Sequence, residues 1–287
     1  MPELPEVEVV KQSLEKYILN KHLIKIVVKN NKLRFPVPKN ISKKLSNLKT
    51  IKVNRISKYV VIEFENNLFL IIHLGMSGTL HLVKKKDKFI NTNLSFYNSK
   101  SLPKSHNHLF FNFKNFSIVY NDPRRFGFIK LIKNKINLNN YFNKLGPDPF
   151  QKSFKFDYIK KYVYKKKRNI KNTLIDQKFV SGIGNIYASE ILNYSKINPL
   201  KSVCNINNEE ICRIIYYTKK VLKLSIKRGG TTINNFHSIK GKSGSYQKEF
   251  RAYDRKDQKC KNKLCSGTIV KLNISNRSTY MCNICQK

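Results

Sequence analysis

The chain has 287 residues, of which 57 are Lys or Arg and 17 are Asp or Glu, so its formal net charge at pH 7 is +40. This charge excludes an acidic disordered tail and an ordinary neutral metabolic enzyme, and it favours a polyanionic partner. Hydrophobic residues make up 40% of the chain and no run of about 18 uncharged apolar residues occurs, which excludes wholesale disorder and a membrane span. Because an AT-rich genome also enriches Lys, Asn and Ile, the charge by itself does not identify the partner.

The N-terminal segment is predicted to form an amphipathic helix over residues 5–18. Pro5 suits the first helical position, and Glu6 and Glu8 suit the positive end of the helix dipole. Three glutamates precede the first lysine, unlike the basic start of a secretory signal peptide, so we expect a cytoplasmic protein. Apolar residues recur on one face of the helix, at Val7, Val10, Leu14 and Ile18.

The next part of the chain changes from helical to strand periodicity. Residues 60–64 and 68–74 alternate in character around Glu65-Asn66-Asn67, which predicts a β-hairpin. Residues 108–113 and 117–120 form a second pair of predicted strands. We therefore expect residues 1–135 to be one mostly β domain with a leading helix.

A linker is predicted over residues 136–150, where Gly146-Pro147-Asp148-Pro149 breaks the pattern. The following residues, 151–245, are predicted to be a helical domain. The tail, residues 246–287, is polar, rich in cysteine and β-like. The candidate helices cover residues 157–164, 169–177, 186–194 and 209–228, the last of which ends at Gly229-Gly230.

Four cysteines of the tail have the spacing of a metal site. Four residues separate Cys260 from Cys265, two separate Cys282 from Cys285, and sixteen lie between the pairs. Two close pairs around a hairpin predict a tetrahedral structural site for one Zn²⁺, which would replace a core that so short a segment cannot build. Arg277 is expected near the tip of this hairpin, where it can reach a phosphate or a groove.

The first residues of the chain are also candidates for catalysis. Removal of Met1 would expose the secondary amine of Pro2. An α-amino group has a pKa of about 8, so a fraction of the Pro2 amines is unprotonated and nucleophilic at neutral pH. Attack on a sugar C1′ would give an iminium ion, which is an electron sink for β-elimination. Glu3 can protonate the sugar or a leaving group. The alternative is that these residues only form an acidic start of the helix and take no part in catalysis.

Several motifs occur in order: MPELPEVE at residues 1–8, HLGMSG at 73–78, DPRRFG at 122–127, DQ at 176–177 before GIGNIY at 182–187, and RGGTT at 228–232. Together with the terminal cysteines they closely resemble the bacterial formamidopyrimidine-DNA glycosylase family, also called Fpg or MutM. The resemblance runs from residue 1 to residue 287. It implies a bifunctional base-excision repair enzyme that removes 8-oxoguanine and ring-opened purines and cuts the strand by β,δ-elimination.

The resemblance also implies an α+β fold. An N-terminal β-sandwich begins with the catalytic helix, and a helical domain with a helix-two-turn-helix element and the Cys₄ zinc-finger hairpin follows. The implied partner is damaged double-stranded DNA, bound by a monomer in the bacterial cytoplasm and nucleoid without membrane contact. Residues 231–246 resemble the loop that covers the flipped base.

Roles for single residues follow from the same resemblance. A base inside a duplex is unreachable, so the nucleotide must be flipped out and the vacated space filled. For catalysis, the resemblance implies that Pro2 is the nucleophile, that Glu3 is the acid and that Glu6 supports the N-terminal helix. For DNA binding, it implies that Lys58 binds a phosphate near the lesion, that His73 and Asn185 contact further phosphates, and that Arg277 contacts DNA from the zinc hairpin. The residues implied to fill the vacated space are Met76, Arg124 and Phe126.

Some positions depart from the family pattern. The first cysteine pair is wider than the usual spacing of two, and Asp254 stands where the family usually has Gly. Two other functions remain open: an endonuclease VIII-type enzyme for oxidised pyrimidines, and a non-catalytic DNA- or RNA-binding protein. Leu4 together with Met76, Arg124 and Phe126 favours the purine branch, and Pro2-Glu3 favours an enzyme.

Overall fold

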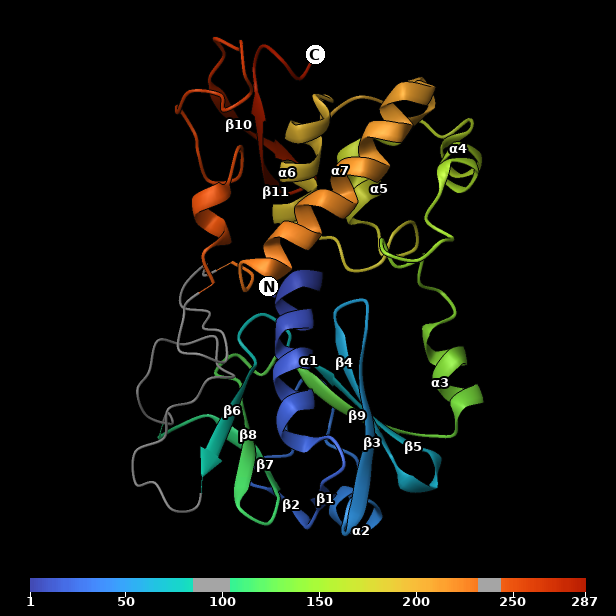
Figure 1. Cartoon of the computed structure of the whole chain (residues 1–287), viewed down its shortest axis with the longest axis vertical. Helices are drawn as coiled ribbons and strands as arrows, with labels where there is room; N and C mark the ends of the chain where they lie inside the picture. The colour runs from blue at the N-terminus through green and yellow to red at the C-terminus, as the bar shows by residue number, and fades with distance from the viewer. Residues whose placement is uncertain (85–103, 232–243) are drawn as a thin grey trace. The chain divides into compact units, whose positions relative to one another are not determined.

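The computed structural model describes residues 1–84, 104–231 and 244–287, and the chain divides into two compact units (Figure 1). The first unit comprises Met1–Asn143 and Ile226–Ser245, and the second comprises Lys144–Ser225 and Tyr246–Lys287. Within the described residues, no helix has both the length and the apolar character that a membrane crossing demands.

The first unit contains two antiparallel sheets behind helix α1 (Leu4–Ile18). The five-stranded sheet has the order β1-β3-β4-β5-β9, with β1 His22–Leu23, β3 Leu48–Ile56, β4 Tyr59–Phe64, β5 Leu68–His73 and β9 Phe128–Lys133. The four-stranded sheet has the order β2-β7-β8-β6, with β2 Lys25–Val28, β7 Asn107–Asn112, β8 Phe116–Asn121 and β6 Thr79–Lys84. Short elements join them: α2 Ile41–Leu45, the 3₁₀ turn η1 Glu65–Asn67 and α3 Lys135–Phe142.

One apolar core joins α1 to both sheets, which makes this unit a β-sandwich. Helix α1, blue in Figure 1, contacts β3 and β4. The predicted helix, the predicted hairpin and the second strand pair are confirmed to within a residue or two. The core draws on α1 and on both sheets, for example at Leu14, Val60, Ile72, Leu109 and Ile118.

The outer face of the five-stranded sheet is covered as well. Val61, Phe69 and Ile71 form a second apolar cluster with Leu138 of α3. Because both faces are buried, β4 and β5 are nearly continuous apolar runs. Helix α3 lies in the segment 136–150 for which the sequence predicts a linker, so the first half of that segment is helical and packed.

The second unit is mostly helical and ends in a hairpin. The four helices predicted from the sequence are confirmed with small shifts at their ends. They are α4 Phe156–Val163, α5 Ile170–Ile175, α6 Asn185–Ser195 and α7 Asn208–Lys227, with 3₁₀ turns η2 Val203–Asn205 and η3 Tyr246–Glu249 and strands β10 Ile269–Ile274 and β11 Arg277–Cys282. Helix α6 packs against both α5 and β11, so the hairpin is fixed to the helices.

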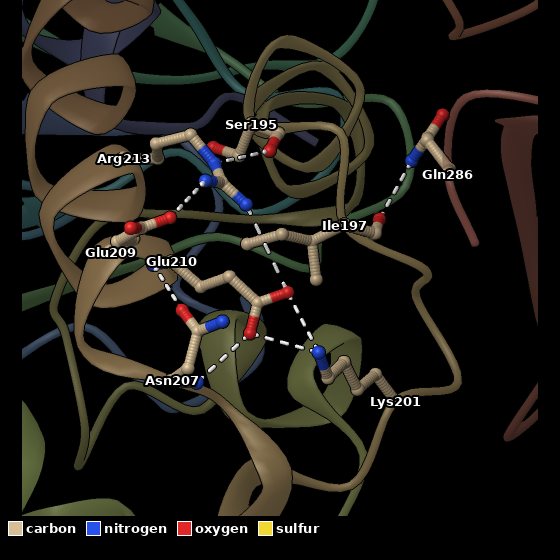
Figure 2. Close-up of polar contacts among 8 residues, drawn as sticks. All are labelled: Ser195, Ile197, Lys201, Asn207, Glu209, Glu210, Arg213 and Gln286. Atoms are coloured by element: carbon tan, nitrogen blue, oxygen red, sulfur yellow. Dashed lines mark hydrogen bonds and ion pairs between the residues drawn. The ribbon is translucent and has the colours of Figure 1, made fainter.

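A polar network fixes the connection between α6 and α7 (Figure 2). The Glu210 carboxylate accepts hydrogen bonds from Lys201 Nζ at 2.7 and 2.9 Å and from the Asn207 backbone N–H at 2.9 Å. The Asn207 side chain accepts from the Glu210 N–H, which completes a reciprocal cap at the start of α7. Arg213 Nε donates to the Ser195 carbonyl at the end of α6 at 3.0 Å, so the C-terminus of α6 is held by a cation.

Candidate active site

The N-terminal residues are buried and tied together by Glu6. Pro2 is buried, and Glu3 caps α1 in a reciprocal pair with Glu6, whose Oε2 accepts from the Glu3 N–H at 3.0 Å. The other oxygen, Oε1, accepts from the N–H and the hydroxyl of Thr231 at 2.9 and 3.0 Å. Glu6 is 2% exposed. One buried carboxylate thus joins the chain start to Thr231. Of the expected base-covering loop, 231–246, residues 232–243 lie outside the described residues.

Lys58 lies in the tight turn between β3 and β4 and is buried. Ser57 before it has a left-handed backbone, with φ of 55°. Arg55 holds this turn, because its Nε donates to Glu8 of α1 at 2.8 Å and its NH1 donates to the Ser57 carbonyl at 3.1 Å. The salt bridge therefore positions Lys58 relative to α1.

His73 ends strand β5 and is neutral at physiological pH. Burial, then the charges of Lys58 and Arg34, lower the pKa of His73 to about 4. The Gly75 N–H donates to Nδ1 at 3.1 Å, which leaves Nε2 as the protonated nitrogen of the neutral ring. The ring stacks on Phe128 with centroids 5.2 Å apart. Among the residues that the structure describes, no group accepts from Nε2, so this N–H can donate to a ligand.

The loops that carry Met76, Arg124 and Phe126 are joined by Asp122. This buried carboxylate accepts from the Ser77 hydroxyl, and from the Gly127 N–H at 2.8 Å. Ser77 Oγ in turn accepts from the Arg124 N–H at 3.1 Å. A side chain at Gly75, which has φ of +62°, would collide with the backbone of Phe126 and Gly127, so the two loops are in direct contact.

The apolar members of this trio are not core residues. Met76 is 49% exposed and Phe126 is 44% exposed, although both sit on tightly bonded loops. The Arg124 guanidinium lies 4.6 Å from the centroid of the Phe126 ring. A thioether, a guanidinium and an aromatic ring are therefore exposed on two loops that contact each other.

Asn185 begins helix α6, after a loop organised by Gln177. The Gln177 side chain accepts from the Gly182 N–H and donates to the Ile183 carbonyl, each at 2.8 Å. The Gly182 N–H is therefore occupied by the Gln177 side chain. Asn185 Nδ2 donates to the Ser278 carbonyl at 2.8 Å, which places it beside the hairpin.

Arg277 is the first residue of β11 and is exposed. The turn itself is Ser275-Asn276, with φ values of 49° and 58°, so Arg277 directly follows the tip, as the sequence predicts. Asn172 and Lys171 of α5 anchor the hairpin, since Asn172 donates to Ser275 Oγ and the buried Lys171 donates to Thr279 Oγ1, both at 2.9 Å. Arg277 is therefore held on a rigid support.

The four cysteines of the tail converge as their spacing predicts. Their sulfur atoms lie within 4.8 Å of one another, with Cys260 and Cys285 at 3.7 Å and Cys265 and Cys282 at 3.5 Å. A tetrahedron of sulfurs at the usual zinc–sulfur length of about 2.3 Å has edges of about 3.8 Å. The four thiols therefore fit a metal ion of this kind, and the wider first pair does not prevent convergence.

Sequence reasoning missed several residues of the site. Arg34 acts on the His73 charge, and the exposed Phe35 packs edge-on against Phe128 with centroids 5.2 Å apart. Asp122 and Thr231 lay inside motifs, but their linking roles arise from contacts between distant segments. Only the exposed aromatic after a basic residue, Arg34-Phe35, could have been noticed in the sequence.

Two family models match the chain, and both describe parts of a DNA glycosylase. The formamidopyrimidine-DNA glycosylase N-terminal domain matches residues 1–129, and the H2TH domain of the same enzyme matches residues 145–237. Among curated relatives, the formamidopyrimidine-DNA glycosylase of Rickettsia bellii is 37% identical over 288 residues and that of a Wolbachia from Brugia malayi is 36% identical over 287, each covering 100% of both chains.

Solved structures agree with these matches. The complex between Lactococcus lactis Fpg and DNA containing an abasic site has a TM-score of 0.87 at 29% identity and 99% coverage of both chains. A MutM complex with DNA containing carbocyclic 8-oxo-G has a TM-score of 0.86 at 29% identity and 100% coverage of both. The chain belongs to the formamidopyrimidine-DNA glycosylase family.

Proposed function

We propose that this protein is a bifunctional base-excision repair enzyme that acts on damaged double-stranded DNA. It removes oxidised purines, namely 8-oxoguanine and formamidopyrimidines, and then cleaves the abasic strand. The DNA complexes of the related Fpg and MutM proteins support a damaged duplex as substrate. The observation that carries the proposal is the buried Pro2-Glu3 start, fixed by Glu6, since a binding protein has no use for it.

Catalysis begins at the Pro2 nitrogen once Met1 has been removed. Met1 is half exposed, so it is accessible for removal. The free amine attacks C1′ of the lesion nucleotide, the bond from C1′ to the base breaks, and Glu3 supplies the proton that the opening sugar or the leaving group takes up. Cleavage of the C1′–O4′ bond gives an iminium ion, which accepts the electron pair left behind when a C2′ proton is removed. The enamine so formed expels the 3′ phosphate, which leaves with the electron pair of the C3′–O bond. A further elimination then releases the 5′ phosphate.

The remaining site residues bind and shape the DNA in this proposal. Lys58, His73, Asn185 and Arg277 contact phosphates, and the neutral His73 donates from Nε2. Met76, Arg124 and Phe126 fill the space that the flipped nucleotide leaves, which accounts for their exposure.

The zinc assignment and the setting complete the proposal. One structural Zn²⁺, held by Cys260, Cys265, Cys282 and Cys285, would cross-link the hairpin that carries Arg277. The expected boundaries stay a prediction: a catalytic domain over 1–135, a DNA-binding domain over 151–245 and a zinc finger over 246–287. We propose that the protein acts as a monomer at the nucleoid in the cytoplasm.

Replacement of Pro2 by glycine tests the enzyme. We expect Pro2→Gly to lose strand cleavage on an 8-oxoguanine duplex while it still binds that duplex, because phosphate contacts do not involve Pro2. Cleavage at the wild-type rate would exclude the iminium step. A thymine-glycol duplex run in parallel separates the endonuclease VIII-type alternative, which would cleave that lesion in preference. If wild-type protein binds both duplexes but cleaves neither, the result would favour the non-catalytic DNA-binding alternative.

A further inference from the structure

An open basic groove lies beside the cysteine cluster, at the end of α6 remote from Asn185. It encloses about 520 Å³ and is lined by residues from the end of α6, the segment after η3 and the loop between the first two cysteines, namely Tyr194, Lys196, Glu249, Arg251, Lys261, Asn262 and Lys263. With a rise of 1.5 Å per residue, α6 separates this groove from Asn185 by about 15 Å.

The widened cysteine pair builds one wall of the groove. The two additional residues lengthen the loop between Cys260 and Cys265, and Asn262 inside this loop is buried. Its side chain donates to Cys285 Sγ at 3.0 Å and to the Asn193 carbonyl of α6 at 3.5 Å. Asn262 therefore docks the loop on the end of α6, and the exposed Lys261 and Lys263 on either side of it flank the groove.

The floor of the groove is rigid. Arg251 lies over the Tyr194 ring at 4.4 Å from its centroid, and its guanidinium also donates to the Lys261 carbonyl. The end of α6 is fixed from the other side, because Gln286 Nε2 donates to the Ile197 carbonyl at 2.9 Å (Figure 2). Because the backbone is held at both ends, ligand binding would order the lysine side chains but little of the main chain.

The positive charge of the groove is greater than the capping of helix α6 requires. Four cations, Lys196, Arg251, Lys261 and Lys263, line the groove with one carboxylate, that of Glu249. The buried Glu190 carboxylate also lies close to Arg251 and Lys261, so the cations still outnumber the nearby carboxylates by two. The C-terminus of a helix carries about half a negative charge, and at α6 the Ser195 carbonyl already accepts from Arg213. Capping of the helix therefore does not account for the cluster, whereas an anionic ligand does.

We propose that this groove binds the phosphate backbone of a second nucleic-acid segment, distinct from the segment that carries the lesion. An open groove with lysines on its rim suits a continuous phosphodiester chain. The groove lies at the opposite end of α6 from Asn185, so the two positions are separated by the length of this helix. Two duplex segments held by one molecule would keep the enzyme on DNA between encounters with lesions.

The test is a titration of the zinc-loaded full chain with a short undamaged duplex at low salt, followed by the stoichiometry of binding. We expect a tight first event and a weaker second event, with a log–log salt slope of about −0.9 per phosphate contacted. The triple variant Lys196→Gln, Lys261→Gln, Lys263→Gln should weaken the second event at least about tenfold and leave the first unchanged. The matched control removes the same charge from the exposed Lys39, Lys43 and Lys44 and should retain both events.

Unchanged zinc content and an unchanged first event show that the groove variant is folded. The proposal is overturned if wild-type protein shows no second event, if the groove variant retains it, or if both triple variants weaken it equally. No cleavage is measured and the DNA is undamaged, so these outcomes are independent of the proposed repair activity.

Discussion

Glu190 provides the sharpest test of how the zinc hairpin is joined to the helices. This residue of α6 is 0% exposed, and its carboxylate accepts three backbone hydrogen bonds: Oε1 from Ala252 at 2.9 Å and Tyr253 at 2.8 Å, and Oε2 from Arg251 at 2.9 Å. These N–H groups belong to the turn that leads into the first cysteine pair. One buried anion therefore fixes the entry to the zinc hairpin.

The effect of Glu190→Gln follows from this geometry. The glutamine oxygen can replace Oε1 and keep two bonds, but its NH₂ group must then face the Arg251 N–H. One charge-assisted bond is lost and two donors oppose each other in a buried site, which costs about 2–3 kcal/mol. The larger Glu190→Ala change leaves three donors unsatisfied and should cost about 4 kcal/mol or more.

Hydrogen exchange of the backbone amides measures this effect locally. We expect the protection of the Ala252 and Tyr253 amides to fall about fifty-fold in Glu190→Gln, since about 1.4 kcal/mol corresponds to a factor of ten. Glu209→Gln is the matched control, because that side chain is 85% exposed and its ion pair with Arg213 spans 3.8 Å. Equal protection of these amides in the two variants would refute the reasoning.

Four further outcomes are expected. Asp122→Ala should destabilise the protein by at least about 2 kcal/mol in urea unfolding and lower lesion cleavage, because three donors lose their acceptor. His73 binds a proton near pH 6.5 in the unfolded chain but only near pH 4 in the folded protein, so the free energy of unfolding decreases as the pH falls between these values. His73→Gln should remove up to about 3 kcal/mol of that decrease, measured by comparing urea unfolding at pH 7.5 and pH 4.5. Asp254 has φ of 56°, and its carboxylate accepts from the Tyr280 hydroxyl at 3.4 Å. Asp254→Gly relieves the backbone but loses this bond, so it should change stability by less than about 1 kcal/mol in the same assay. Metal analysis should find about one zinc per chain, and folded, active protein with none would contradict the Cys₄ assignment.

The sequence predicted those elements whose signal is local. Two apolar runs around the Glu65–Asn67 turn place the hairpin, and the helical spacing in residues 5–18 places α1, so both were predicted correctly. Helix α3 was missed because its sequence, KINLNNYF, has little amphipathic character. Its stability comes from Leu138 packing on the outer face of the sheet, which no local pattern reveals.

In the candidate site, too, some features could be predicted from the sequence and others could not. The cysteine cluster was predictable because spacing along the chain fixes which ligands can meet. The link from Glu6 to Thr231 joins residues 225 positions apart, and the link from Ser77 to Asp122 joins residues 45 positions apart. Such contacts depend on the tertiary fold, so the sequence could supply the site residues by resemblance but not the bonds that hold them.

The most direct test of the central claim is borohydride trapping on a duplex with one 8-oxoguanine opposite cytosine. An iminium ion between Pro2 and C1′ is reduced to a stable amine, which retains the protein on the DNA. The account predicts a covalent adduct whose cross-linked peptide begins at Pro2. An adduct at another residue, or no adduct from folded, zinc-loaded protein that binds this duplex, would contradict it.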